Sequence, residues 1–338
     1  MLRFSDAKSS APVQEESANT HAAGLLTNGQ PVFYEIPENS CALGFYRTTT
    51  NYLSETFEKI KQGQPFSIDQ GYAIVREIMD STVTRDEWYE EINRISYSME
   101  SDGFLVLHHA NVAIYTICLS MTLRFTREEQ TRVGIAALFH DIGKVCLPRE
   151  ILCKDGKLTL EEREVLRQYP FRSYEILNGL GREFGMSAEC ALMVNERMDG
   201  SGFPRGLSGN AIHCHAQMIG LVDVYEAMTN SRPYRKKWLH YDAIREILRK
   251  RKSEFHQSYI KALLRTFSIF RLNSYVKLNS GVVGRIIEVR EDLPMRPKIE
   301  VLYDSENLRL PFPYVVDLLT QPVLNIAAPV AESELNAV

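Results

Sequence analysis

The sequence predicts a mainly α-helical protein with a small β appendage near its C-terminal end. Apolar residues recur with the period of a helix from about residue 67 onwards, and residues 100–268 are helical in pattern except for a Gly-rich segment at 199–207. Beyond residue 272 the period changes to two, which is typical of strands. We therefore expect a helical body followed by a β hairpin and one further strand.

The N-terminal part divides into a tail and a helical region. Residues 1–25 are rich in Ser, Ala, Glu and Gln and have little to bury, so we expect a disordered tail. The segment 31–36 favours a single strand. The remainder of 26–99 is predicted to be helical, and sensing, dimerisation and simple packing on the rest of the chain are the open alternatives for its role.

Capping boxes mark four expected helix starts. Each places a hydroxyl residue three positions before Glu or Gln and ahead of an apolar helical pattern. The four pairs are Ser67 with Gln70, Thr84 with Glu87, Thr126 with Glu129, and Thr159 with Glu162.

The C-terminal part is expected to be a small β unit. Residues 275–278 and 282–289 alternate around Asn-Ser-Gly at 279–281, as in a hairpin, and 298–303 adds a third strand. The expected boundaries are 100–270 for the helical domain, 271–325 for the β subdomain and 326–338 for a frayed tail.

Composition limits the classes of partner. A length of 338 residues suggests about two domains, and 44% hydrophobic with 24% charged residues is typical of a soluble globular protein. The net charge of −4 argues against a nucleic-acid polymer or a membrane surface as partner, because both select basic proteins. No run approaches the roughly 18 apolar residues of a membrane span, and the N-terminus lacks the apolar core of a signal peptide.

The cysteines indicate a reducing compartment. The six cysteines are scattered and include no Cys-x-x-Cys pair, which argues against a zinc ribbon or a disulfide framework. We therefore predict a cytoplasmic protein with reduced thiols.

The helical run 136–144 carries the most informative residues. It ends in His140-Asp141, and an imidazole and a carboxylate at a helix end can converge on one cation. Lys144 lies one turn beyond His140, where an ammonium group would meet an anion held by that cation. A core histidine paired with its neighbour is the alternative reading.

Further polar residues lie in apolar helical surroundings. They are His108, Glu196 beside the Gly-rich segment, and Asp223 within an apolar run. Buried carboxylates are costly unless they are paired or bound to metal. Taken singly, each of these residues is more often a satisfied core group than a ligand, but their order on separate helices favours a common site.

This order, together with the motifs that follow it, resembles a known family. The Gly-rich motif is Glu196-Arg197-x-Asp199-Gly200-Ser201-Gly202-Phe203-Pro204-x-Gly206-Leu207-x-Gly209, followed by Asp223-Val224-Tyr225-Glu226-Ala227-Met228-Thr229 and Arg232-Pro233-Tyr234-Arg235. From about 100 to about 320 the chain resembles the HD phosphohydrolase superfamily, and within it the HD-GYP family of bacterial cyclic di-GMP phosphodiesterases. The resemblance implies a helical bundle that holds two or three metal ions, usually iron or manganese, and hydrolyses cyclic di-GMP.

The resemblance also implies roles for individual residues. The metal ligands would be His108, His140, Asp141 and Asp223, and the catalytic residues would be Asp141 and Lys144. The ligand-binding residues would be Lys144, Phe203, Arg232 and Arg235, with Phe203 in place of the tyrosine of the family motif.

Four further positions depart from the family pattern. Tyr169 stands where the family has a histidine, Val194 and Asn195 replace two histidines, and Phe104 replaces a glutamate. Valine and phenylalanine offer no ligand atom and asparagine offers only a neutral oxygen, so the second and third metals lose nearly all their ligands. One divalent transition metal is therefore expected, iron or manganese first and zinc second. Tyr169 bound as a phenolate to ferric iron is the alternative.

The sequence is consistent with two functions. The first is a degenerate HD-GYP protein that binds one metal and cyclic di-GMP, with weak or absent hydrolysis and a role in signalling as a homodimer or with a GGDEF-type partner. The second is an active phosphodiesterase on cyclic di-GMP or another phosphate ester. His109 is expected to point away from the metal, and His213 and His215 are interpreted as a surface pair rather than ligands.

Overall fold

The computed structural model describes residues 41–81, 88, 103–154, 156–230, 238, 240–267, 272–290, 293, 295–330 and 334–335. The chain forms two compact units, one of residues 1–238 with 251–256 and one of residues 239–250 with 257–338. This division falls before residue 270, where the sequence places the end of the helical domain. The expected strand at 31–36 and the expected box at Thr84 lie outside the described residues.

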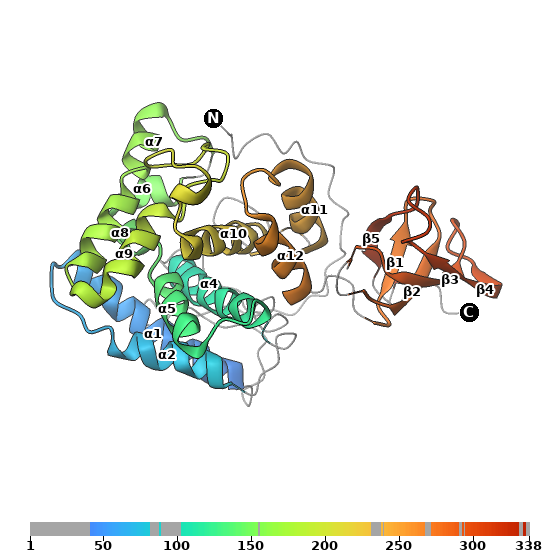
Figure 1. The fold of residues 1–338 in the computed structure, drawn as a ribbon, viewed down its shortest axis with the longest axis horizontal. Helices are drawn as coiled ribbons and strands as arrows, with labels where there is room; N and C mark the ends of the chain where they lie inside the picture. Colours follow the sequence, from blue (N-terminus) through green and yellow to red (C-terminus); the bar gives the residue numbers. More distant parts are fainter. Residues whose placement is uncertain are drawn as a thin grey trace, which may run out of the picture. The chain divides into compact units, whose positions relative to one another are not determined.

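The first unit is helical, as predicted (Figure 1). Its elements are α1 (Cys41–Lys61), α2 (Asp69–Asp80), α4 (Gly103–Thr122), α5 (Arg127–Leu138), the 3-10 helix η1 (Ile142–Cys146), α6 (Arg149–Leu152), α7 (Leu160–Leu166), α8 (Tyr169–Asn178), η2 (Arg182–Phe184), α9 (Gly185–Met193), η3 (Gly209–Ala211) and α10 (Cys214–Thr229).

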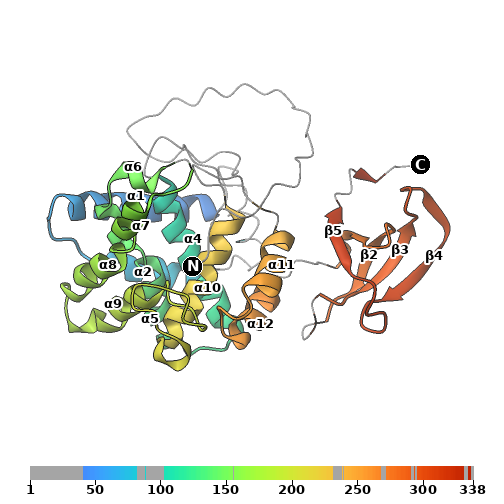
Figure 2. The same ribbon diagram turned by 90° about the horizontal axis from the view of Figure 1, so that it is seen from above.

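Helix α4 is the apolar centre of this unit, and α1, α5 and α10 pack against it (Figures 1 and 2). The helix is long and apolar enough to cross a membrane, but 94% of its apolar window is buried inside the protein. Burial by the surrounding helices therefore accounts for its composition.

Two of the expected capping boxes form. Thr126 caps α5 and Thr159 caps α7, each with the reciprocal hydrogen bonds to the glutamate three residues later. The prediction for Ser67 was wrong, because α2 begins at Asp69 and has no side-chain cap. The Ser67 hydroxyl instead accepts a hydrogen bond from the Asp69 backbone N–H at 3.1 Å, one residue too early for a box.

Two glycines permit the close contacts on which the candidate site depends. A Cβ on Gly143 would lie 2.3 Å from the Tyr169 carbonyl oxygen, so only glycine lets η1 approach α8. A Cβ on Gly220 would lie 2.4 Å from the Val194 carbonyl oxygen, so only glycine lets α10 lie against the end of α9.

The second unit contains α11 (His240–Lys250), α12 (Gln257–Thr266) and an antiparallel sheet of order β4-β3-β2-β1-β5. The strands are β1 (Tyr275–Leu278), β2 (Val283–Glu288), β3 (Lys298–Tyr303), β4 (Arg309–Asp317) and β5 (Ile326–Val330). The predicted hairpin and third strand are confirmed as β1, β2 and β3. Alternate residues of β3 are buried, as a sheet with one covered face requires.

The expected frayed tail needs correction at its start. Residues 326–330 form β5, which pairs with β1 from Leu278↔Ile326 to Tyr275↔Val330. Ile326 is buried in the core of the sheet with Val276 and Leu278. This short segment therefore forms the edge strand of the sheet beside β1.

Candidate metal centre

Two helices and the turn between α5 and η1 bring together the residues His108, His140, Asp141 and Asp223. His108 lies on α4, His140 and Asp141 lie between α5 and η1, and Asp223 lies on α10. Helix α5 ends at Leu138, and the turn that follows lets adjacent side chains converge. His140 Nδ1 lies 2.8 Å from the Ala137 carbonyl oxygen, so Nδ1 carries the proton and donates it there, which leaves Nε2 to face the cluster.

The donor atoms surround a single position. His108 Nε2 lies 3.2 Å from Asp223 Oδ1 and 3.8 Å from Asp141 Oδ2. His140 Nε2 lies 3.4 Å from Asp141 Oδ2 and 3.9 Å from Asp223 Oδ1. Ligands with bonds of about 2.1 Å to one ion are separated by roughly 3.0 to 3.4 Å at octahedral or tetrahedral angles. Small side-chain movements would therefore bring all four residues onto one ion.

Glu226 orients the first of these ligands. Its Oε2 lies 2.5 Å from His108 Nδ1, and its Oε1 accepts a hydrogen bond from Asn111 Nδ2 at 3.1 Å. A carboxylate on the far nitrogen of a metal-binding histidine fixes its tautomer and aims the other nitrogen at the ion. Residues 223 and 226 lie about one turn apart on α10, so one helix supplies both a ligand and the orienting group. In the sequence, only the spacing of Glu226 from Asp223 points to this role.

Electrostatics around the cluster favour a cation. Burial alone lowers the pKa of His108, but the Glu226 charge and the hydrogen bonds to Asp141 and Asp223 outweigh it and raise the pKa to about 10. Burial likewise opposes the charge of His140, and Asp141 reverses this effect and raises the pKa. Burial raises the pKa of Asp141, yet His140 and Lys144 hold it well below its usual range. Without an ion, protons on the imidazoles supply the positive charge.

The residues present fit a divalent metal. His140 Nε2 is buried and has no hydrogen-bond partner, which is costly unless an ion fills that direction. With both imidazoles neutral, the carboxylates of Asp141, Asp223 and Glu226 outnumber the single ammonium of Lys144 by two charges. A divalent cation balances that difference, and a set of imidazoles and carboxylates suits iron, manganese or zinc.

Tyr169, Val194 and Asn195, the positions where the family has histidines, lie beside the cluster. A hydrogen bond joins two of them to each other. The buried amide of Asn195 donates from Nδ2 to the Tyr169 hydroxyl at 2.7 Å, and Val194 is fully buried. Lys144 forms an ion pair with Asp141 and lies 4.9 Å from the centre of the Tyr169 ring. Burial, followed by the charges of Asp141 and Asp223, raises the pKa of Tyr169 well above its usual value. Without a bound ion the phenol is therefore neutral, and a phenolate on ferric iron stays a prediction.

The Gly-rich loop is tied to the end of α9. Buried Glu196 accepts hydrogen bonds from the backbone N–H groups of Arg205 at 2.7 Å and Leu207 at 2.9 Å. The loop places the ring of Phe203 edge-on to Tyr169 at 6.4 Å, and Arg167 lies over Phe203 at 5.3 Å. Glu196 therefore holds the loop, and Arg167 is a nearby cation that no sequence motif indicates.

The other predicted residues fall into three groups: two lie at the site, two lie outside the described residues, and one points away from the cluster. Lys144 lies beside the cluster, and Phe203 lies against Tyr169, as described above. Arg232 and Arg235 lie outside the described residues. His109 points away from the cluster, as predicted, because its Nδ1 donates to the Leu138 carbonyl oxygen at 2.7 Å and its ring packs on Phe57.

Comparison with known families identifies two regions. Residues 96–258 match the HD domain, and residues 275–337 match a KOW domain associated with the HD domain.

Curated relatives share this region. The chain is 29% identical over 263 residues to cyclic di-GMP phosphodiesterase PA4108 of Pseudomonas aeruginosa, covering 78% of this chain and 62% of that protein. It is 39% identical over 153 residues to 3'3'-cGAMP-specific phosphodiesterase 1 of Vibrio cholerae, covering 43% of this chain and 35% of that protein. The chain spans less than two thirds of the length of the first curated relatives that it matches.

A solved structure shares the fold. Bd1817, a HDG"Y"P protein from Bdellovibrio bacteriovorus, matches with a TM-score of 0.51 and 13% identity, covering 65% of this chain and 69% of that one.

Proposed function

The chain belongs to the HD phosphohydrolase superfamily, and from this premise we propose that it is a degenerate HD-GYP-type protein that binds one metal ion and cyclic di-GMP with weak or absent hydrolysis. The observation that carries the proposal is a contrast within one buried region. The set of His108, His140, Asp141 and Asp223 is complete, whereas Tyr169 and Asn195 satisfy each other.

The four residues would hold the ion, with iron or manganese favoured by their nitrogen and oxygen atoms and zinc as the alternative. When bound, such an ion supplies Lewis acidity and lowers the pKa of bound water. Glu226 holds His108 in the required tautomer, through the 2.5 Å contact at Nδ1. Lys144 is placed to exchange its ion pair with Asp141 for a phosphate oxygen of the ligand.

Ligand binding would involve three further residues by family resemblance. Phe203 would present its ring to a base of the dinucleotide, and Arg232 and Arg235 would hold its phosphates. An acidic chain must concentrate its cations locally to hold two phosphates. Arg167, over the Phe203 ring, adds a cation on this side of the loop.

Weak hydrolysis follows from the missing ligands. In multi-metal hydrolases each ion contributes several kcal/mol to transition-state stabilisation. A loss of roughly 3 to 5 kcal/mol lowers the rate by about two to four decades. We therefore propose a signalling role in a bacterial cytoplasm, as a receptor for cyclic di-GMP that acts as a homodimer or on a GGDEF-type partner.

The second candidate is an active phosphodiesterase on a cyclic dinucleotide or another phosphate ester. The complete four-residue set and the position of Lys144 beside Asp141 favour it. The name of the V. cholerae relative, which specifies 3'3'-cGAMP, widens the class of substrates to test.

One purified sample decides between the candidates. Metal content by elemental analysis and linear dinucleotide production are measured together on the full chain. Asp141→Ala is the test variant, and Asp242→Ala, at a partly exposed carboxylate that pairs with Arg245 on α11, is the control. One metal equivalent, lost only in Asp141→Ala, with measurable cyclic di-GMP binding and negligible product supports the receptor. Metal-dependent turnover comparable to that of active relatives supports the enzyme, and the loss of two or more equivalents in Asp141→Ala would contradict the proposed single ion.

A further inference from the structure

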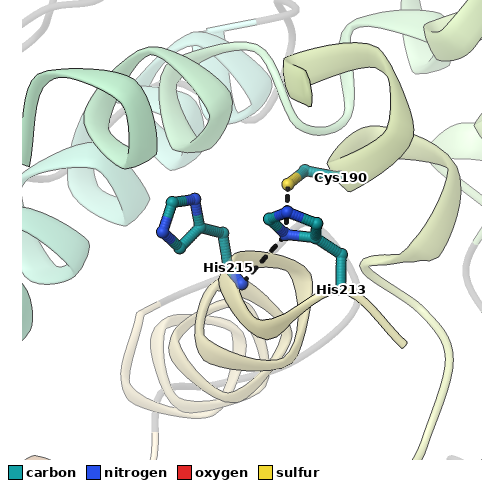
Figure 3. Close-up of side chains that lie close together, drawn as sticks. All are labelled: Cys190, His213 and His215. Atoms are coloured by element: carbon teal, nitrogen blue, oxygen red, sulfur yellow. Dashed lines mark hydrogen bonds between the residues drawn. The ribbon is translucent and has the colours of Figure 1, made fainter. Parts of the chain in front are cut away.

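A second group of metal-binding side chains lies between α9 and the start of α10 (Figure 3). It consists of Cys190 on α9, His213 immediately before α10, and His215 in the first turn of α10. The sulfur and one nitrogen from each ring lie within 4.8 Å of one another. The three residues therefore converge although α9 and α10 are separated by the Gly-rich loop.

The separation between sulfur and nitrogen fits a tetrahedral ion. Cys190 Sγ lies 3.5 Å from His213 Nδ1, and the rings of His213 and His215 lie 5.1 Å apart. Zinc bonds of about 2.3 Å to sulfur and about 2.05 Å to nitrogen at a tetrahedral angle place the two atoms about 3.5 Å apart.

His215 provides an independent sign of a ligand. Its Nδ1 is buried and has no hydrogen-bond partner. Burial lowers the pKa of His213 and of His215, so both rings are neutral at pH 7, the form that binds metal. A buried imidazole nitrogen without a partner needs a proton donor or a cation, and the neighbouring thiol makes a thiophilic cation the better match.

The surroundings are rich in sulfur. The Cys190 thiol lies 3.5 Å from Met186 Sδ, and the His213 backbone N–H lies 3.4 Å from Met193 Sδ. Thioethers are soft and polarisable, and this environment favours zinc over the hard cations magnesium and calcium.

His213 also has a structural role that competes with metal binding. Its Nδ1 accepts a hydrogen bond from the His215 backbone N–H at 3.2 Å and so caps α10. A neutral imidazole nitrogen has one lone pair, so it cannot cap the helix and bind an ion at the same time. The cap explains the position of His213, but it explains neither the buried thiol beside it nor the unpartnered nitrogen of His215.

We propose that Cys190, His213 and His215 form a second metal site, selective for a thiophilic divalent ion such as Zn²⁺ and separate from the centre at His108 and Asp223. On binding, the Cys190 S–H bond breaks, the proton leaves to solvent, and a zinc–sulfur bond forms while both imidazoles donate lone pairs. Burial raises the pKa of the Cys190 thiol, so the metal itself must drive this deprotonation, and binding strengthens as the pH rises. The ion would tie α9 to the first turn of α10.

Cobalt tests the site, because only a thiolate ligand gives a thiolate-to-cobalt charge-transfer band in the near ultraviolet. The full chain, reduced and stripped of metal, is titrated with Co²⁺. We expect the band to appear within two equivalents of added cobalt, since the His108 centre also takes up the ion, and to vanish when Zn²⁺ is added. Absence of the band at these ratios would overturn the proposal.

Matched variants locate the site. Cys190→Ser should abolish the band, whereas Cys214→Ser, a change at the exposed neighbouring cysteine, should leave it intact. His213→Asn keeps a strong N-cap residue but removes the imidazole, so a tenfold or greater loss of cobalt affinity separates metal binding from capping. His215→Gln repeats the test without a change to the buried thiol. Asp141→Ala should remove one equivalent of cobalt and keep the band. A band that survives Cys190→Ser, or one that depends on Cys214 or Asp141, would refute the assignment.

Discussion

Glu226 is expected to control metal affinity although it does not face the ion. Replacing it by Gln keeps its size and removes its charge. The His108 Nδ1 proton then loses a carboxylate acceptor at 2.5 Å, in a region where His108 is only 4% exposed and water screens little. The loss of such an orienting group from a metal-binding histidine typically weakens metal binding by 10- to 100-fold, or about 1.4 to 2.8 kcal/mol.

The hydrogen-bond chain around Glu226 predicts that Glu226→Gln also lowers the stability of the metal-free protein. The Tyr46 hydroxyl donates to Asn111 Oδ1 at 2.8 Å, Asn111 Nδ2 donates to Glu226 Oε1, and His108 donates to Glu226 Oε2. A carboxylate accepts from both sides, whereas an amide must turn its NH₂ group toward either Asn111 or His108. One donor then faces another donor, and we expect the metal-free variant to lose about 1 to 3 kcal/mol of stability.

The assay is competition for Mn²⁺ or Zn²⁺ against a chelator of known affinity, with unfolding measured in denaturant on the same samples. Tyr46→Phe is the matched control, because it breaks only the far end of the chain and should change metal affinity less than threefold. The reasoning is refuted if Glu226→Gln binds metal within twofold of the unchanged protein, or if Tyr46→Phe weakens binding as much.

Three further predictions concern the same centre. Changing Tyr169, Val194 and Asn195 together to His should add a second metal equivalent and raise cyclic di-GMP hydrolysis at least tenfold; uptake of the ion without turnover would place the defect elsewhere. The pKa of His108 is raised from 6.5 to about 10, so its contribution to the metal-free protein is full below pH 6.5 and lost as the pH rises through 10. Denaturant unfolding should therefore show stability falling across that range, and a flat profile would contradict it. Lys144→Met should weaken cyclic di-GMP binding in calorimetry and reduce its salt dependence, whereas unchanged affinity would remove Lys144 from the ligand site.

The sequence predicted the fold well where local patterns decide structure. The boxes at Thr126 and Thr159 form because each hydroxyl, backbone N–H and glutamate lie within one turn, and the strands of the hairpin follow from alternation alone. The box at Ser67 failed because its hydroxyl binds the nearer N–H of Asp69. Residues 326–330 were missed because their strand is stabilised by pairing with β1, which the local sequence does not reveal.

The candidate site was predicted where buried polar residues interrupt apolar helices. His108, His140, Asp141 and Asp223 stand out because their surroundings give them few positions outside the core. Glu226 does not stand out in the same way, because the helical period does not show whether a carboxylate reaches an imidazole on another helix. The contact between Cys190 and His213 likewise escaped prediction, because the two residues meet across 23 positions of chain. The sequence suggested only a surface pair of His213 and His215.

The proposed number of ions at the His108 centre rests on which of its buried polar atoms lack a hydrogen-bond partner. A centre that had merely lost its ligands would leave polar atoms without partners, and each would destabilise the fold. The Asn195 amide nitrogen and the Tyr169 hydroxyl avoid this cost, because they bond to each other at 2.7 Å with Lys144 over the ring. His140 Nε2 has no such partner, although it lies in the same helical unit and is fully buried. An ion at the first position would remove the penalty at His140 Nε2, whereas an ion at the second would have to break a bond that is already made. These hydrogen bonds support our proposal of one ion at this centre.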